Sequence, residues 1–278
     1  MRKVELINGI SSSVLGFGCA PILGSVGAAE AKRAIDCAID HGINHFDIAR
    51  SYGYGEAEAF VGKILKDKRQ QIVLASKFGI KANWKANLLK PIKPVVRVLR
   101  KGKKSVPSPE TTAAPAITVA DRFHNRIAIN PVEMRKSLEE SLRALKTGHL
   151  DFFLIHEPLE TIQNLQDVLN AAESLKKDGK IRAFGLAYMR SQGQLHQQYI
   201  NDFDVLQFDN SPGAANYDYT VNNRGKESNI IFSPLRGGSR ELAPDQKLKQ
   251  LFVDFPQSVI LCSMYNTKHI INNTALAV

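Results

Sequence analysis

The chain has 278 residues, of which 44% are hydrophobic and 23% charged, with a formal net charge of +10. One α/β barrel averages about 250 residues, so the length fits a single barrel or two small domains, and the composition is that of a globular protein. The longest apolar runs are only strand-length and Met1–Ile10 mixes apolar with charged residues, which excludes a membrane span and a secretory signal and predicts a cytoplasmic protein.

The cysteines are three and scattered, at Cys19, Cys37 and Cys262. An odd, unclustered set argues against a disulfide framework and against a zinc site. We therefore expect buried, reduced thiols and no bound metal.

Eight short apolar runs, each followed by a helix-like stretch, are candidate strands: Val14–Gly18, Asn44–Asp47, Ile72–Lys77, Leu150–His156, Ile181–Leu186, Val205–Phe208, Ile230–Ser233 and Val259–Cys262. Helical spacing places apolar side chains on one face of Ala28–His41, Pro131–Leu145 and Ile162–Lys177. Strand and helix in alternation predict parallel strands joined by crossovers. Eight such units predict an α/β protein with a closed (β/α)₈ TIM barrel, a single domain over residues 1–278.

One stretch, Lys81–Asn130, interrupts this alternation after the third strand. It contains five prolines, and its part Lys81–Arg126 carries eleven basic residues against Glu110 and Asp121, which is almost all of the net charge. Such a length is exceptional for a connection, so we interpret it as a loop or a mobile flap. It lacks the interleaved aromatic residues of a nucleic-acid-binding surface, so no nucleic-acid partner is expected; an acidic partner, a membrane surface and guidance of a phosphorylated cofactor are the alternatives.

Polar side chains stand at three successive strand ends. Asp47 ends the second candidate strand and Tyr52 follows five residues later, Lys77 ends the third, and His156 ends the fourth. The C-terminal ends of barrel strands face the active site, so these four groups are expected to meet there. Taken singly, each has an ordinary structural explanation: a loop cap, a solvated lysine or a core imidazole.

This set of groups suits carbonyl reduction. Hydride addition to a C=O group develops alkoxide charge, which needs a positioned acid. Tyr52 is the expected proton donor, with Lys77 lowering the phenol pKa and Asp47 holding Lys77 charged. A neutral His156 would orient the carbonyl oxygen.

The same residues lie in motifs that resemble the aldo-keto reductase family. Asn44–Gly53 (NHFDIARSYG) resembles the segment around its catalytic Asp and Tyr, Ala75–Gly79 (ASKFG) its catalytic-lysine strand, and Asp151–Pro158 (DFFLIHEP) its catalytic-histidine strand. The resemblance implies a TIM-barrel oxidoreductase that binds NADP(H) and acts on a small carbonyl compound.

The resemblance also implies a cofactor site. Gln207 would hold the nicotinamide carboxamide, Phe232 would stack on the ring, and backbone N–H groups of the loop Ser233–Gly238 would suit the pyrophosphate. The loop and helix start at Ser263–Asn273 would hold the adenosine end. The expected cofactor-binding residues are Gly18, Gln207, Phe232, Ser233, Leu235, Gly237, Ser263, Met264, Tyr265, His269 and Asn273.

Three positions depart from the family pattern. Ala187-Tyr188 replaces the usual Ser-Asn pair that contacts the carboxamide, and His269, beside Lys268, replaces the Arg that commonly clasps the adenosine 2′-phosphate. NAD(H) is therefore an alternative to NADP(H). Glu157 follows His156 where Trp or Asn is common; we expect Glu157 to line the substrate pocket and to disfavour anionic substrates. Trp84, at the start of the insert, is the second expected pocket residue.

Two other functions are compatible with parts of this pattern. A nucleotide-binding barrel with a regulatory or redox-sensing role and little turnover is favoured by the missing Ser-Asn pair, but has less need of all four polar residues. A Schiff-base barrel would use Lys77 as nucleophile but leaves Tyr52 and Gln207 unexplained.

Overall fold

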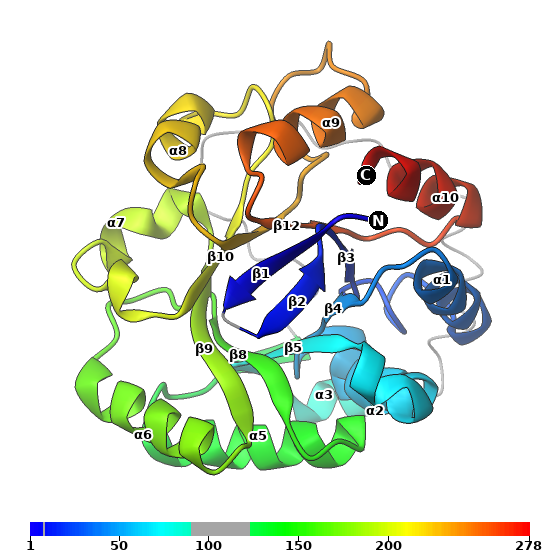
Figure 1. The fold of residues 1–278 in the computed structure, drawn as a ribbon. Helices are drawn as coiled ribbons and strands as arrows, with labels where there is room; N and C mark the ends of the chain where they lie inside the picture. The colour runs from blue at the N-terminus through cyan, green and yellow to red at the C-terminus, as the bar shows by residue number, and fades with distance from the viewer. Residues whose placement is uncertain (8, 90–122) are drawn as a thin grey trace.

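The structure is a computed structural model that describes residues 1–7, 9–89 and 123–278. Eight parallel strands close into a barrel with helices around it, which confirms the predicted fold (Figure 1). In barrel order the strands are β3 (Leu15–Gly18), β4 (His45–Asp47), β5 (Val73–Phe78), β8 (Leu150–His156), β9 (Ile181–Tyr188), β10 (Val205–Asp209), β11 (Asn229–Phe232) and β12 (Val259–Cys262). Each candidate strand from the sequence corresponds to one of them.

The strands are apolar runs because both of their faces are covered. All seven residues of β8 are buried, and Phe153 packs on Phe78 of the neighbouring strand β5 with ring centroids 5.1 Å apart. Gly185 in β9 lets the neighbouring strands pack closely, since a Cβ there would lie 2.5 Å from both a Leu154 side-chain atom and the carbonyl oxygen of Val205. Parallel sheets buried on both faces have this continuous hydrophobic character.

The outer helices follow the strands along the chain. They are α1 (Ala28–Asp40), α2 (Ala57–Leu65), α5 (Pro131–Leu145), α6 (Leu165–Lys177), the short α7 (Gly193–His196), α8 (Tyr217–Arg224), α9 (Pro244–Asp254) and α10 (Thr267–Leu276). Helix α5 has clear end signals: the Asn130 side chain accepts from the Glu133 N–H at its start, Pro131 is its first residue, and Lys146 is left-handed at its end. Its boundaries match the predicted ones.

An N-terminal hairpin covers one end of the barrel, as Figure 1 shows. Strands β1 (Lys3–Ile7) and β2 (Ile10–Ser13) pair in antiparallel fashion. The Ser13 N–H donates to the Asn44 side chain, and Ser12 Oγ lies 3.1 Å from Nδ1 of His45, the first residue of β4. The hairpin therefore closes the N-terminal end of the barrel, and the opposite end is left for a binding site.

A second antiparallel pair lies at the root of the basic insert. Strand β6 (Ile80–Ala82) pairs with β7 (His124–Arg126), and helix α3 (Trp84–Leu89) follows β6. Residues 90–122, on which most of the flap expectation depends, lie outside the described residues. Within the described part of the chain, no helix is both long and apolar enough to cross a membrane.

Candidate active site

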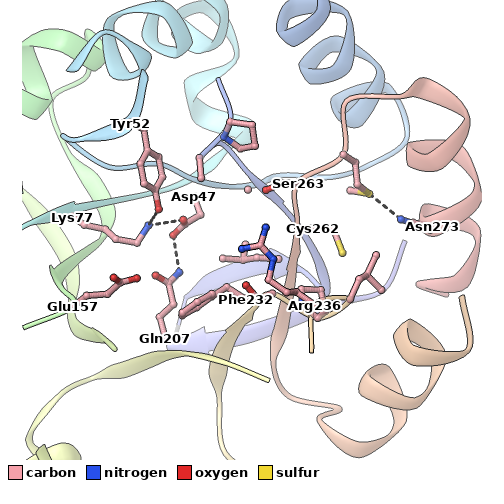
Figure 2. Close-up of a pocket in the computed structure, with 18 of the residues that line it drawn as sticks. Asp47, Tyr52, Lys77, Glu157, Gln207, Phe232, Arg236, Cys262, Ser263 and Asn273 are labelled. Atoms are coloured by element: carbon pink, nitrogen blue, oxygen red, sulfur yellow. Dashed lines mark hydrogen bonds and ion pairs between the residues drawn. The ribbon is translucent and has the colours of Figure 1, made fainter. Parts of the chain in front are cut away.

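A cavity of about 410 Å³ lies at the C-terminal ends of the barrel strands. Asp47 ends β4, Lys77 lies near the end of β5, His156 ends β8, and Gln207 lies in β10. These four residues line the cavity together with Tyr52. Figure 2 labels Asp47, Tyr52, Lys77 and Gln207 among the lining residues. Residues far apart in sequence are thus gathered as expected from the direction of the strands.

Lys77 is the central group of this cluster. Its ammonium donates to Asp47 Oδ1 at 2.5 Å, to the Ile48 carbonyl oxygen at 3.1 Å and to Tyr52 Oη at 3.4 Å. An ammonium has three donors, so each has one acceptor. Burial acts to lower the pKa of Lys77, but the adjacent Asp47 carboxylate and Tyr52 oxygen raise it overall. The side chain is therefore a buried, permanently charged donor beside the phenol.

Asp47 is held from two sides. One carboxylate oxygen accepts from Lys77, and the other accepts from Gln207 Nε2 at 2.7 Å. Asp47 and Gln207 are both almost completely buried. This bond fixes the orientation of the Gln207 amide, because only its NH₂ group can donate to a carboxylate.

Tyr52 reaches the cluster because the chain makes a tight left-handed turn after β4. Gly53, Tyr54 and Gly55 have φ angles of 60°, 60° and 84°. A Cβ at Gly53 would lie 2.6 Å from the Ile22 carbonyl oxygen, so the close approach requires glycine. The turn directs the Tyr52 phenol towards Lys77, whereas the Tyr54 ring packs edge-on against Phe123. The Tyr52 and Tyr54 side chains therefore lie in different surroundings.

The phenol pKa differs from the sequence-based expectation of a net decrease. The pKa of Tyr52 is raised to about 12, chiefly by burial; Lys77 acts to lower it, and Asp47 and Glu157 act in the same direction as burial. Desolvation of the charged phenolate therefore outweighs the attraction of one ammonium. At neutral pH Tyr52 keeps its proton, which is the state a proton donor requires.

His156 packs against the Tyr52 ring. Its ring lies edge-on to the Tyr52 ring with centroids 5.8 Å apart, and its Nδ1 is buried without a hydrogen-bond partner in the described part of the chain. Burial lowers the pKa of His156 well below its usual value, and the charges of Lys77 and Arg126 and the His124 ring act in the same direction. The imidazole is therefore neutral at physiological pH.

The remainder of the cavity is formed by loops after β11 and β12. Of the residues expected at a cofactor, those that line it are Gly18, Gln207, Phe232, Ser233, Leu235, Ser263, Met264, His269 and Asn273. Gly237 and Tyr265 do not line the cavity, but both form hydrogen bonds next to it. Tyr265 Oη donates to the Gly18 carbonyl oxygen, and the Gly237 carbonyl oxygen accepts from Ser211 Oγ and Lys247 Nζ.

The two residues expected at the substrate lie in different places. Glu157 lines the cavity next to His156. Trp84, the first residue of α3, is 67% exposed and is not among the lining residues. Its place in the sequence, seven residues after Lys77, does not determine the direction of that helix.

Arg236 is the main lining residue that the sequence analysis did not single out. It is exposed at the tip of the loop after β11, where Ser233, Gly237 and Gly238 all have positive φ angles. The signal was present, since Arg236 lies inside the loop expected at a pyrophosphate. Cys262 and Pro21 also line the cavity, and nothing in their local sequence marks them.

The cavity fits a phosphorylated dinucleotide at one end and less well at the other. Arg236 and His269 supply a cation and an imidazole beside backbone amides, which suits phosphate oxygens. Around Gln207 there are fewer polar partners: Ala187, beside it in the sheet, is apolar, and Tyr188 packs its ring near Phe208 and His196. Gln207 uses one of its two amide N–H donors on Asp47, and its carbonyl oxygen can accept. Among the described residues no cluster could hold a metal ion.

Comparison with known proteins agrees with this geometry. Residues 14–197 match the profile described as "Aldo/keto reductase family". The chain is similar to the aldo-keto reductase YhdN of Bacillus subtilis (strain 168), with 31% identity over 187 residues, which cover 64% of this chain and 44% of YhdN. The chain spans about half the length of the curated relatives it matches.

Solved structures show the same fold at lower identity. The holo form of aldo-keto reductase AKR11C1 from Bacillus halodurans superposes with a TM-score of 0.71 and 21% identity, covering 99% of this chain and 90% of that chain. An aldo-keto reductase from Klebsiella pneumoniae in complex with NADPH gives a TM-score of 0.68 and 18% identity, covering 99% and 89%.

Proposed function

Because the chain belongs to the aldo/keto reductase family, we propose that it is an NADP(H)-dependent oxidoreductase that reduces a small aldehyde or ketone reversibly to the alcohol. The observation that carries this proposal is the buried cluster in which one ammonium, Lys77 Nζ, bonds both the Asp47 carboxylate and the Tyr52 phenol at the wall of a cavity. Such a cluster positions a proton donor beside a permanently charged group.

In this proposal Tyr52 gives its proton to the carbonyl oxygen as that oxygen gains negative charge. Lys77, kept charged by Asp47, stabilises the phenolate that is left. His156, neutral and adjacent to Tyr52, hydrogen-bonds the carbonyl oxygen and fixes its orientation before proton transfer. Reduced nicotinamide, when bound, supplies the hydride.

The cofactor would be held along the cavity wall. Gln207 would accept a hydrogen bond from the carboxamide through its free oxygen, and Phe232 would pack on the ring. Arg236 and the backbone of Ser233–Gly238 would meet phosphate oxygens, with His269 and Asn273 at the adenosine end. The NADPH complex of the Klebsiella relative supports NADP(H) as the cofactor.

A nucleotide-binding barrel with a regulatory role and little turnover is the second candidate. The observation that favours it is the apolar Ala187 beside Gln207, which leaves the nicotinamide end of the cavity with few polar contacts. Loose placement of the ring would lower turnover more than binding, because reaction depends on orientation.

A two-step measurement tests these proposals. Fluorescence titration with NADPH and with NADH determines whether the protein binds each nucleotide, and NADPH absorbance is then followed with a panel of small aldehydes and ketones. Tight NADPH binding with carbonyl-dependent oxidation supports the reductase. Binding without oxidation of NADPH by any carbonyl would favour the regulatory barrel, and failure to bind either nucleotide would contradict both.

A further inference from the structure

Tyr188, one of the two residues that depart from the usual Ser-Asn pair, belongs to a different part of the molecule from the catalytic cavity. It ends β9 and is not among the residues that line that cavity. Its ring lies edge-on to His196 of α7, with centroids 5.9 Å apart, and is tilted against Phe208 of β10 at 6.1 Å. The side chain therefore contributes to the outer wall of the barrel.

A second cavity, of about 640 Å³, lies at Tyr188 on this outer wall, and we call it the outer pocket. Helices α7 and α8 lie on the same side of the barrel, next to β9 and β10 (Figure 1). Tyr188 and Phe208 from the two strands, Gln194 of α7 and Tyr219 and Arg224 of α8 are among its lining residues. None of the lining residues is shared with the catalytic cavity, so the two cavities are separate.

The Tyr188 hydroxyl is a buried hydrogen-bonding group without a protein partner. The residue is only 5% exposed, and none of the described residues donates to Oη or accepts from it. The pKa of Tyr188 is raised to about 12, chiefly by burial; Arg224 and Arg190 act to lower it and Asp209 to raise it. The phenol therefore keeps its proton at neutral pH and can donate. Buried hydroxyl groups are almost always hydrogen-bonded, so this one points to a partner from outside the chain.

Two guanidinium groups that line the outer pocket also keep unused donors. Arg190 is held through Nε and Nη1, which donate to two carbonyl oxygens and one hydroxyl oxygen. Arg224 is held through Nε and Nη2 by Asn229 and Glu227. In the part of the chain that the structure describes, neither Arg190 Nη2 nor Arg224 Nη1 has an acceptor. Both side chains are thus fixed by the protein, with one NH₂ group each left to donate to a ligand.

A phenol and two guanidinium groups select a ligand that supplies acceptors. Guanidinium groups bind carboxylates through paired N–H donors, which gives both affinity and orientation. Glu227 pairs with one arginine, and Asp209 accepts from the backbone N–H of the other, so these carboxylates offset much of the positive charge. One negative charge therefore suits the outer pocket better than a multiply charged anion. Phe208 and the exposed ring of Tyr219 supply apolar surface for a flat ring.

We propose that the outer pocket is a second ligand site, which binds a small aromatic carboxylate. The carboxylate oxygens accept from Tyr188 Oη and from the unused NH₂ groups of Arg190 and Arg224, and the ring packs against Phe208. The site goes beyond the proposed reductase function and does not depend on it, because none of its residues touches the catalytic cavity.

The test measures binding by calorimetry, with benzoate as the probe and benzyl alcohol as its neutral counterpart. The native protein is compared with Tyr188→Phe, which removes the buried hydroxyl and keeps the ring that packs on His196 and Phe208. Tyr219→Phe is the matched control, because it removes a hydroxyl from a lining residue that is 67% exposed. Tyr52→Phe tests whether benzoate binds in the catalytic cavity instead.

We expect Tyr188→Phe to weaken benzoate binding by about tenfold, as for loss of a hydrogen bond to a charged group. Tyr219→Phe and Tyr52→Phe should each leave the affinity within about twofold, and benzyl alcohol should bind the native protein at least about tenfold more weakly than benzoate. Equal losses in Tyr188→Phe and Tyr219→Phe, or a loss in Tyr52→Phe alone, overturn the inference. Failure of the native protein to bind benzoate at millimolar concentration, or tighter binding of inorganic phosphate, rejects the aromatic carboxylate.

A second measurement on the native protein decides the matter if Tyr188→Phe does not fold, as judged by its thermal melting curve. Nuclear Overhauser effects are recorded from the ring protons of bound benzoate to assigned side chains. Contacts to the methyl groups of Ile200 and the ring of Tyr219, which line the outer pocket, support the inference. Contacts to Leu235 or Met264, which line the catalytic cavity, overturn it.

Discussion

Both ends of the barrel contain a buried carboxylate that is bonded to a cationic side chain, but their surroundings differ. At the N-terminal end, Asp151 accepts from Arg69, from Arg182 and from the Leu74 N–H, all at 2.9 Å. At the C-terminal end, Asp47 accepts from Lys77 and Gln207. The hollow at the N-terminal end is even the larger, about 640 Å³ against about 410 Å³.

The hydrogen-bond networks around Asp151 and Asp47 differ in the groups at which they end. The remaining hydrogen bonds of Arg69 go to the carbonyl oxygens of Ile72 and His149 and to Thr147 Oγ1, whose own hydroxyl donates to the His149 carbonyl oxygen, so this network turns back on the backbone. Lys77 instead contacts a phenol that faces open space beside a neutral imidazole. A buried ion pair or a large hollow is therefore no sign of function by itself; a proton donor at the end of the network is.

The largest effect should come from removing that proton donor. Tyr52→Phe deletes the phenolic hydroxyl at the end of the Lys77 network and should lower kcat for carbonyl reduction by roughly 10²-fold or more. NADPH affinity, measured by fluorescence, should change little. Tyr54→Phe is the matched control, because its ring packs on Phe123 and not on the cluster. Near-normal turnover of Tyr52→Phe with loss in Tyr54→Phe would reverse the assignment.

The N-terminal network should respond in the opposite way. Asp151→Asn leaves two arginines beside a neutral buried side chain, which should cost about 3 kcal/mol of unfolding free energy and lower the melting temperature by about 6–12 °C. Turnover per folded molecule at 25 °C should be kept. The control Asp36→Asn breaks an exposed pair with Lys32 and should cost under about 1 kcal/mol. If Asp151→Asn abolished turnover without lowering stability, the two ends would not differ as described.

The fold could be predicted because its signals are local. Apolar runs buried on both faces marked all eight barrel strands, and helical spacing predicted the observed limits of α5, Pro131–Leu145. The hairpin β1–β2 and the pair β6–β7 were missed. Strand β1 does alternate exposed and buried residues, so its sequence carries a strand signal that was not used, whereas β7 joins β6 only across the long insert. Pairing over such a separation leaves no mark in either segment.

The site could be predicted only in part, because its electrostatics depend on packing. The strand-end rule gathered Asp47, Lys77 and His156 correctly at one end, but the sequence gives no measure of how much water is excluded around Tyr52. That burial reverses the expected direction of the phenol pKa. Likewise, the Gln207 bond to Asp47 and the Arg126 bond to the Glu157 carbonyl oxygen join segments with no sequence relation.

A smaller effect is expected at the phosphate end of the cavity. Arg236→Ala removes the exposed guanidinium from the lining and should weaken NADPH binding by about tenfold, as for loss of a charge-assisted hydrogen bond. The loss should shrink at high salt. Arg240→Ala, four residues on and outside the lining, is the control. Equal affinity of the two variants would show that Arg236 does not reach a phosphate.

The Tyr52 phenol gives a prediction for pH. A proton donor is active below its pKa, so with a pKa of about 12 Tyr52 should stay protonated from neutral to mildly alkaline pH. Glu157 raises this pKa, so Glu157→Gln should move the phenolate transition to lower pH. The difference in ultraviolet absorbance between each protein and its Tyr52→Phe derivative measures the transition. A shift to higher pH would mean that the Glu157 charge does not act on the phenol.

The smallest effect should follow from replacing residues 90–122 by a short Gly/Ser linker. Our expectation that this segment adds no core to the barrel depends on its flanks: Ala82 pairs with His124, and the Asn83 N–H donates to the Phe123 carbonyl oxygen, so a short linker has little distance to span. Closing a shorter loop costs less entropy, so stability should rise by about 1 kcal/mol, with NADPH affinity within about twofold. Because β6 extends directly from the strand that carries Lys77, KM for the carbonyl substrate is the quantity expected to move. Unfolding of the shortened chain would instead make the segment part of the core, and the description of the molecule as one barrel with an appended insert would be wrong.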